Sequence, residues 1–141
     1  MCRMSCVLRV GVAVILLALG MVGCAGSGAG AKTESLQVEA QKEVAGLASS
    51  RWAALIRGEL DKAYTYLSPG TRDVMPLDLY KSKIRTGRWK KASVDSVSCE
   101  QELCKVIMII EYSYGDMKSV ETRLEETWLQ ERGKWWYVPR K

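Results

Sequence analysis

The sequence predicts an α+β domain in which three N-terminal helices pack on a curved four-stranded antiparallel sheet. Apolar residues recur at helical spacing up to Gly87, and runs rich in β-branched and aromatic residues follow it. Helices that precede a series of consecutive strands are typical of the α+β class. The chain has 141 residues, which leaves room for a single domain.

Three helices are predicted between residues 34 and 87. The second spans residues 60–67 and stops at Ser68-Pro69-Gly70, whereas the third begins near Pro76 and has Gly87 as its C-terminal cap. The first carries an apolar stripe formed by Val44, Leu47, Ala48, Trp52, Leu55 and Ile56.

Four strands, joined as an antiparallel meander, are predicted at residues 88–99, 104–114, 119–131 and 134–139. Arg132-Gly133 is a tight-turn signal between the last two strands. In the second strand the even-numbered apolar residues share one face, while Ile107 and Ile109 make the other face apolar as well. We therefore expect that strand to be covered on both sides.

The N-terminal segment predicts export. Arg3 and Arg9 precede an uncharged apolar run at residues 10–22, which is shorter than the roughly 20 residues of a transmembrane helix and fits a secretory signal peptide. The run ends in Met21-Val22-Gly23-Cys24, which resembles the lipobox of bacterial lipoproteins, although those proteins usually carry Leu, Val or Ile where Met21 stands. Ordinary cleavage after Ala25 or Ala29 and an uncleaved membrane anchor are the alternatives.

The lipoprotein resemblance implies that residues 1–23 are removed and that Cys24 carries acyl chains such as palmitate. Residues 24–33 are rich in Gly and Ala, which predicts a flexible tether to a domain at residues 34–141. In lipoproteins an aspartate after the lipidated cysteine often means retention at the inner membrane. Ala25 stands there instead, which implies an outer-membrane anchor facing the periplasm.

The charge of the mature chain is mild. Without Arg3 and Arg9, 19 of the 21 basic residues remain against 16 acidic ones, which gives a net charge of about +3. This balance and the predicted envelope location argue against nucleic acid as a partner. The chain has no histidine, the usual proton shuttle near neutral pH and the commonest metal ligand, so we expect neither a metal nor another cofactor.

Cys99 and Cys104 form the pair that would remain in an oxidising compartment, because Cys2 and Cys6 lie in the signal peptide and Cys24 carries the lipid. They flank a four-residue connection between two predicted strands, where a disulfide fits. Zinc is the rival, but two cysteines without histidine supply too few ligands. We therefore predict a structural disulfide in preference to metal or redox chemistry.

Two segments resemble the nuclear-transport-factor-2-like (ketosteroid-isomerase-type) fold. The helical stretch RWAALIRGELDKAYTYLSPGTR is similar to the opening of that fold, and EETWLQERGKWWYV is similar to its paired final strands. The resemblance covers about residues 40–138 and is one of pattern. It implies a strongly curved sheet that wraps the long helix into a cone with an apolar mouth.

The aromatic residues are candidates for lining such a cone. Phenylalanine is absent, so every aromatic side chain has a polar group. These side chains can line an apolar pocket with a few hydrogen-bond donors, or they can simply fill the core of a small domain. Trp135 and Trp136 are neighbours on one strand and therefore point to opposite faces. The candidate pocket residues are Trp52, Tyr64, Tyr80, Tyr112, Trp128 and Trp136.

Enzymes of the resembled fold place an acid inside the cone, often with a tyrosine as a hydrogen-bond donor. Here the tyrosines would be Tyr64, Tyr80 and Tyr112, but the spacing places no acid beside any of them. Without histidine or a matching motif, we assign no catalytic residue and expect no enzyme. The acids that would qualify are Asp61, Asp78, Asp95, Glu111 and Glu126.

A basic cluster surrounds Trp89 where the helices give way to strands. Its members are Arg85, Arg88, Lys90 and Lys91. They could meet lipid head groups or an acidic envelope polymer, and the plainer interpretation is a solvent-exposed face.

Three functions are compatible with these features. The first is a lipid-anchored cell-envelope protein that binds a small apolar ligand or an envelope protein without chemistry. The second is a lyase or isomerase that uses an acid and a tyrosine in the cone. The third is a structural or assembly lipoprotein with a filled core. Fold alone does not separate them, and the oligomeric state is not encoded in any motif.

Overall fold

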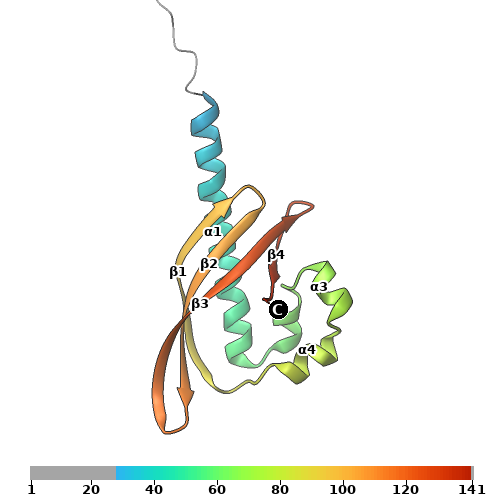
Figure 1. The fold of residues 1–141 in the computed structure, drawn as a ribbon, viewed down its shortest axis with the longest axis vertical. Helices are drawn as coiled ribbons and strands as arrows, with labels where there is room; N and C mark the ends of the chain where they lie inside the picture. The colour runs from blue at the N-terminus through green and yellow to red at the C-terminus, as the bar shows by residue number, and fades with distance from the viewer. Residues whose placement is uncertain (1–27, 141) are drawn as a thin grey trace, which may run out of the picture.

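The computed structural model describes residues 28–140, which form four helices and one four-stranded antiparallel sheet (Figure 1). The helices are α1 (Gly28–Arg57), α2 (Leu60–Tyr64), α3 (Pro69–Val74) and α4 (Leu77–Lys83). The strands are β1 (Trp89–Glu100), β2 (Leu103–Tyr114), β3 (Met117–Glu131) and β4 (Lys134–Val138). Sequential neighbours pair throughout, in the order β1-β2-β3-β4.

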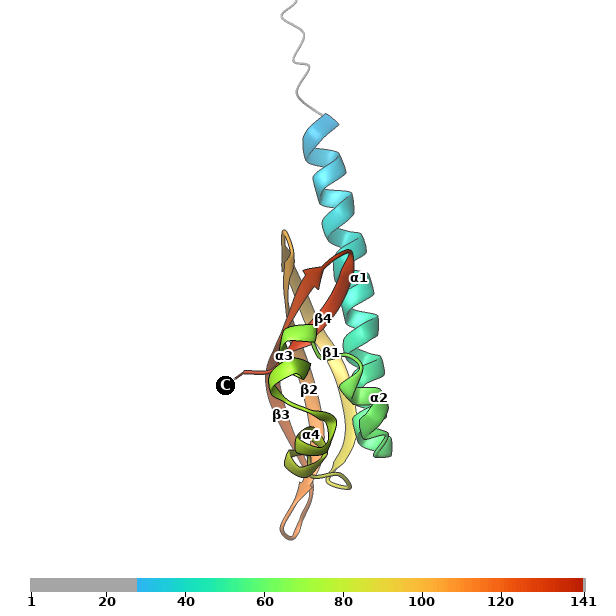
Figure 2. The ribbon, with the colours of Figure 1, turned by 90° about the vertical axis from the view of Figure 1, so that its right-hand side faces the viewer.

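Helix α1 is the longest element and extends beyond the sheet at its N-terminal end (Figure 2). Its residues 32–39 are exposed, whereas Val44, Ala48 and Leu55 in its second half are buried in the core. The helix ends before Gly58, whose φ of +75° is a left-handed conformation that glycine adopts without a steric penalty. No helix in the described part of the chain is long and apolar enough to span a membrane.

The prediction of three N-terminal helices packed on a curved sheet as a cone is wrong. One helix of 30 residues packs along the sheet, and three helices of five, six and seven residues follow it. Helix α1 begins at Gly28, inside the segment predicted as a tether. Its residues 32–39 are exposed, so no buried stripe in them indicates a helix.

Ser68-Pro69 starts a helix instead of only ending one. The Thr71 amide donates to Ser68 Oγ at 3.2 Å, and Pro69 occupies the first turn of α3. This is the ordinary N-cap arrangement, in which a side-chain oxygen satisfies a free amide and proline costs no hydrogen bond. The same residues that end one helical pattern therefore begin the next helix.

Two-residue turns join the four strands. Glu100 pairs with Leu103, Tyr114 with Met117 and Glu131 with Lys134. Each turn contains a residue with positive φ, as tight hairpins require: Gln101, Gly115, and Arg132 with Gly133. The pairing of Thr122 with Ile110 and of Glu126 with Val106 places alternate residues of β2 and β3 on the face that carries the core.

The opposite face of the sheet is only partly covered. Ile107 and Ile109 point away from the core face and stay only partly buried. The expectation that β2 is covered on both sides is therefore not met.

The segment between α2 and α3 runs beside β4. The Ser68 amide donates to the Tyr137 carbonyl at 3.0 Å, and the Tyr137 amide donates to the Tyr66 carbonyl at 2.7 Å. These bonds pair backbone groups that a sheet edge would otherwise leave free. They also hold the short helices against the end of the sheet that contains the core aromatics.

Candidate ligand-binding site

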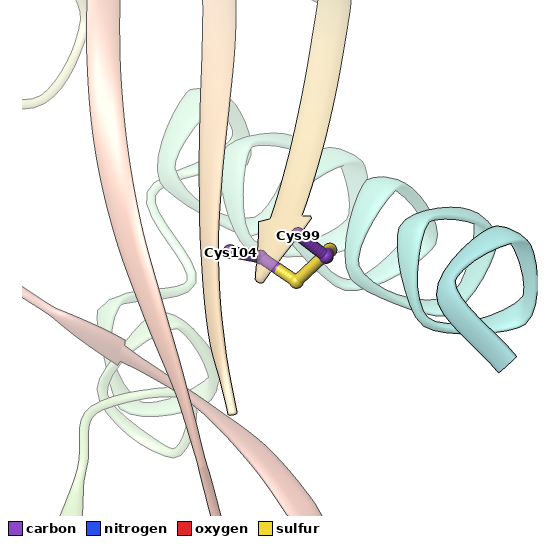
Figure 3. The surroundings of a disulfide bond; sticks show 2 residues. All are labelled: Cys99 and Cys104. Carbon is purple, nitrogen blue, oxygen red and sulfur yellow. A yellow bond between two sulfur atoms is a disulfide. The ribbon is translucent and has the colours of Figure 1, made fainter. Parts of the chain in front are cut away.

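Cys99 and Cys104 face each other across the first hairpin and form a disulfide (Figure 3). Their Cα atoms are 4.1 Å apart, and the connection is a two-residue turn because Glu100 and Leu103 also pair. The predicted disulfide pair is thus confirmed. No group of three or more His, Cys, Asp or Glu side chains within residues 28–140 is arranged to hold a metal ion.

A cavity of about 430 Å³ opens where the α4–β1 connection meets the sheet. We call it the basic pocket. Its apolar and aromatic lining comes from Trp52, Ile84, Trp89, Ile110, Tyr112 and Leu124. Its polar lining comes from Thr122 and from the four cations Lys83, Arg85, Arg88 and Arg123.

Local structure explains why these residues meet. Helix α4 ends at Lys83, Ile84 is already extended, and Gly87 turns the chain with a φ of +82°. This turn leads the loop into β1, where Trp89 lies edge-on to Trp52 of α1 with ring centroids 5.5 Å apart. Alternation along β2 and β3 then supplies the sheet side of the pocket.

The lining is apolar but open to solvent. Ile110 is 2 % exposed, whereas Leu124 on the neighbouring strand is 38 % exposed although it lies on the core face. Trp89 and Tyr112 are half-buried. An apolar side chain that points inward and is still exposed to solvent is the feature expected of a ligand-binding site.

The cations at the rim differ in their partners. Arg123 donates to Asp95 at 2.5 Å. Lys83, Arg85 and Arg88 are exposed and form no ion pair with any residue in the described range. Among residues 28–140, no acidic side chain lines the pocket.

Glu126 forms a separate, fully buried polar cluster. Its side chain is 1 % exposed, and one carboxylate oxygen accepts from Arg51 at 2.6 Å and from the Trp52 indole at 2.7 Å. The other oxygen accepts from the Trp128 indole at 3.1 Å. The Arg51 guanidinium also stacks 3.6 Å from the ring centroid of Tyr137. Three donors therefore satisfy both oxygens of this buried carboxylate.

Tyrosines surround this cluster. Burial raises the pKa of Tyr80 above its ordinary value, and the nearby positive charge of Arg51 offsets part of that shift. Burial likewise raises the pKa of Tyr137, again partly offset by Arg51. Although Arg51 is close enough to influence Tyr80, the Tyr80 hydroxyl makes no hydrogen bond of good geometry with a described residue.

The predicted pocket residues are divided between several places. Trp52 and Tyr112 line the basic pocket. Tyr80 and Trp128 are buried in the core, and the Tyr64 hydroxyl donates to the Met75 carbonyl at 3.0 Å. Trp136 lies on the other face of β4 from the buried Trp135, with the Arg72 guanidinium 5.2 Å from its ring.

The acids considered for catalysis are also separated. Glu126 acts electrostatically on the candidate Tyr80, and its carboxylate is buried in an ion pair with Arg51. Asp61 pairs with Lys81, Asp95 pairs with Arg123, and Glu111 accepts from Ser119.

The sequence pattern predicts part of the basic pocket and leaves its other residues unpredicted. Arg85, Arg88 and Trp89 were recognised as a basic cluster, but Ile84, Lys83 and Leu124 were not connected with it. Leu124 had a signal, because its strand phase puts it on the core face. Its pocket partners lie on the α4–β1 loop, which no local pattern places beside β3.

Comparison with known proteins supports a fold and no more. A SEC-C motif-containing protein from Rhodopseudomonas palustris, determined in solution, is similar to this chain with a TM-score of 0.52 and 18% identity. The match covers 64% of this chain and 70% of that protein. No protein-family model and no curated protein sequence matches the chain.

The predicted resemblance to the nuclear-transport-factor-2-like fold is wrong. The solved structure that this chain resembles is a SEC-C motif protein, which has a different fold from that cone. The two segments behind the prediction encode an amphipathic helix and a tight hairpin, which many unrelated α+β proteins share. The predicted lipidation site at Cys24 and the predicted signal peptide at residues 1–23 lie outside the described residues.

Proposed function

We propose that this chain is a lipid-anchored cell-envelope protein whose domain binds a small apolar ligand in the basic pocket without chemistry. One observation carries the proposal: an inward-facing apolar surface, including Leu124 at 38 % exposure, borders a cavity of about 430 Å³. Cavities of about 300–1,000 Å³ with mainly apolar walls and a few polar groups are typical small-ligand sites.

The composition of the pocket favours binding over catalysis. Its lining contains no Asp, Glu, His or Cys, so it offers no ordinary general base beside the apolar floor. Among the candidate acids, Glu126 interacts with a tyrosine. Its carboxylate, however, accepts hydrogen bonds from three donors, and its side chain is 1 % exposed. A carboxylate fixed in this way supports the structure around the pocket.

The anchor remains part of the proposal. Arg3 and Arg9, the apolar run at residues 10–22 and Cys24 favour export and lipidation. The disulfide between Cys99 and Cys104 supports an oxidising compartment, because such bonds are rare in the cytosol.

Filling the pocket tests the binding function. Thr122 lines the pocket on the core face of β3, so Thr122→Phe would place a ring in the cavity. Thr127 lies on the opposite face of the same strand, so Thr127→Phe is the matched control. The readout is energy transfer from tryptophan to N-phenyl-1-naphthylamine, an uncharged apolar probe, with the full chain in phosphatidylcholine nanodiscs and empty nanodiscs as blanks.

We expect saturable probe binding that weakens at least about tenfold in Thr122→Phe and stays unchanged in Thr127→Phe, since tenfold corresponds to about 1.4 kcal/mol. Equal binding by all three proteins would place the probe elsewhere, and no saturable binding by the native chain would refute a ligand pocket.

A further inference from the structure

The rim of the basic pocket concentrates positive charge. Residues 28–140 hold 18 basic residues, since Arg3, Arg9 and Lys141 lie outside that range, and all 16 acidic ones, a net charge of +2. The four cations around the pocket exceed that whole surplus. The rest of the described domain therefore carries a small net negative charge.

Three of these cations are not neutralised by the protein itself. Lys83, Arg85 and Arg88 have no carboxylate partner within residues 28–140. Arg123 is already paired with Asp95, so it is less available to pair with a bound anion. Unpaired like charges beside an apolar cavity repel one another, and an anion placed among them would relieve that repulsion.

We infer that the ligand of the basic pocket is a free anionic amphiphile: one carboxylate, phosphate or sulfonate group on a compact apolar body. The inference rests on the proposed ligand-binding function and adds the ligand's charge. The head group lies at the loop that carries Lys83, Arg85 and Arg88. The apolar body lies against Trp89, Ile110 and Leu124.

The position of the pocket favours a free ligand over the head groups of the anchoring membrane. Trp52 lies near the C-terminal end of α1, about 36 Å from Gly28 at 1.5 Å per helical residue. Figures 1 and 2 show α4 and the start of β1 at the opposite end of the molecule from the first turns of α1. An anchor at the N-terminus would thus be attached at the end farther from the pocket.

A matched pair of probes separates charge from apolar contact. 8-Anilinonaphthalene-1-sulfonate and N-phenyl-1-naphthylamine share the same aromatic body, and only the first is an anion. Both are titrated into the full chain in phosphatidylcholine nanodiscs, with empty nanodiscs as blanks. The test variant is Lys83→Gln/Arg85→Gln/Arg88→Gln. The control is Lys32→Gln/Lys42→Gln/Lys105→Gln, which removes three exposed cations that do not line the pocket.

We expect the sulfonate probe to bind the native chain about tenfold more tightly than the neutral probe, as charge-assisted contacts allow. The test variant should lose that advantage and keep its affinity for the neutral probe, and the control should keep both affinities. Equal loss of sulfonate binding in both variants would overturn the inference, because it would reflect overall charge.

The outcomes also distinguish this inference from the function on which it rests. Binding of the neutral probe with no preference for the sulfonate would overturn the anionic ligand and leave the apolar pocket standing. Failure of both probes would overturn both. Repeating the titration in phosphatidylglycerol nanodiscs tests the source of the anion. A preserved difference between native chain and test variant supports a free ligand, and its loss would mean that membrane head groups occupy the rim.

Discussion

At the scale of single residues, Glu126 is notable because its carboxyl group is removed from water almost completely. Its side chain is 1 % exposed, and Arg51, Trp52 and Trp128 supply the hydrogen bonds that water would otherwise make. A buried ion pair contributes little net stability, but removing one partner leaves an uncompensated charge in the core. The pair links α1 to β3 and so fixes the helix on the sheet.

The first prediction follows from this burial. Glu126→Gln removes the charge that balances Arg51 and should lower the free energy of unfolding by about 3 kcal/mol. Its neighbour Glu125 lies on the opposite face with a partly exposed ion pair to Arg140, so Glu125→Gln should cost less than about 1 kcal/mol. Urea denaturation measures both. Equal costs would show that the buried pair is not what joins helix and sheet.

The second prediction concerns alkaline pH. Burial raises the pKa of Tyr80 in the folded state, so its neutral form is favoured there. The resulting stability is fully present below the ordinary tyrosine pKa of about 10 and is lost as the pH rises through the raised value. Tyr80→Phe should therefore show a smaller loss of unfolding free energy between pH 7 and pH 11 than the native chain. An identical loss in the two proteins would contradict the assignment.

Local residue patterns predicted side-chain roles only where the partners are near in sequence. Cys99 and Cys104 are five residues apart, and their pairing followed from one hairpin. Arg51 and Glu126 are 75 residues apart, and nothing local to either residue indicates the other. Glu126 appeared only as one acid among several, and Arg51 was not recognised at all.

At the scale of elements, the first hairpin is held by a covalent link. The disulfide joins the end of β1 to the start of β2, next to the turn at Gln101. Both cysteines are buried, with Cys104 fully so. The link restricts the unfolded chain by closing a short loop, and it fills space in the core.

The third prediction concerns this bond. Cys99→Ala/Cys104→Ala should lower the free energy of unfolding by about 2 kcal/mol, as expected for closing so short a loop. Thermal unfolding with and without reductant provides the measurement. Reductant should destabilise the native chain and leave the double variant unchanged. Two free thiols in protein taken from the envelope would show that the bond does not form there.

Strands were easier to foresee than helices. Alternating apolar residues and the Arg132-Gly133 signal located the strands of the meander within a few residues. The helices depended on apolar stripes, which fail for the exposed first turns of α1 and for helices of five to seven residues. Topology was harder still, since similar elements occur in different folds, and the cone expected from resemblance was wrong.

For the whole molecule, the first turns of α1 lie at the opposite end from α4 and the start of β1 (Figure 2). Trp52 lies near the C-terminal end of α1 and lines the basic pocket. The proposed anchor, which precedes α1 in the sequence, would therefore be attached at the end farther from the basic pocket. The sequence indicated both the anchor and a basic cluster, but only the folded chain brings that cluster onto an apolar cavity.

The fourth prediction tests the anchor. Cys24→Ser should leave the precursor uncut and without an acyl chain, because the lipobox resemblance makes Cys24 both the lipid acceptor and the first mature residue. Metabolic palmitate labelling and detergent-phase partition measure the result, with Cys6→Ser as the control for cysteine loss in the signal peptide. Unchanged labelling in Cys24→Ser would refute lipidation at this residue.

The central claim is that a small ligand binds beside Trp89. The most direct measurement is ¹⁹F NMR of the full chain labelled with 5-fluorotryptophan, which reports separately on all five tryptophans while N-phenyl-1-naphthylamine is added. We predict that the Trp89 and Trp52 signals shift and saturate together, because both rings line the pocket, and that the Trp136 signal on the other face of β4 stays in place. A shift at Trp136 without one at Trp89, or saturable binding with no change at Trp89, would contradict the account.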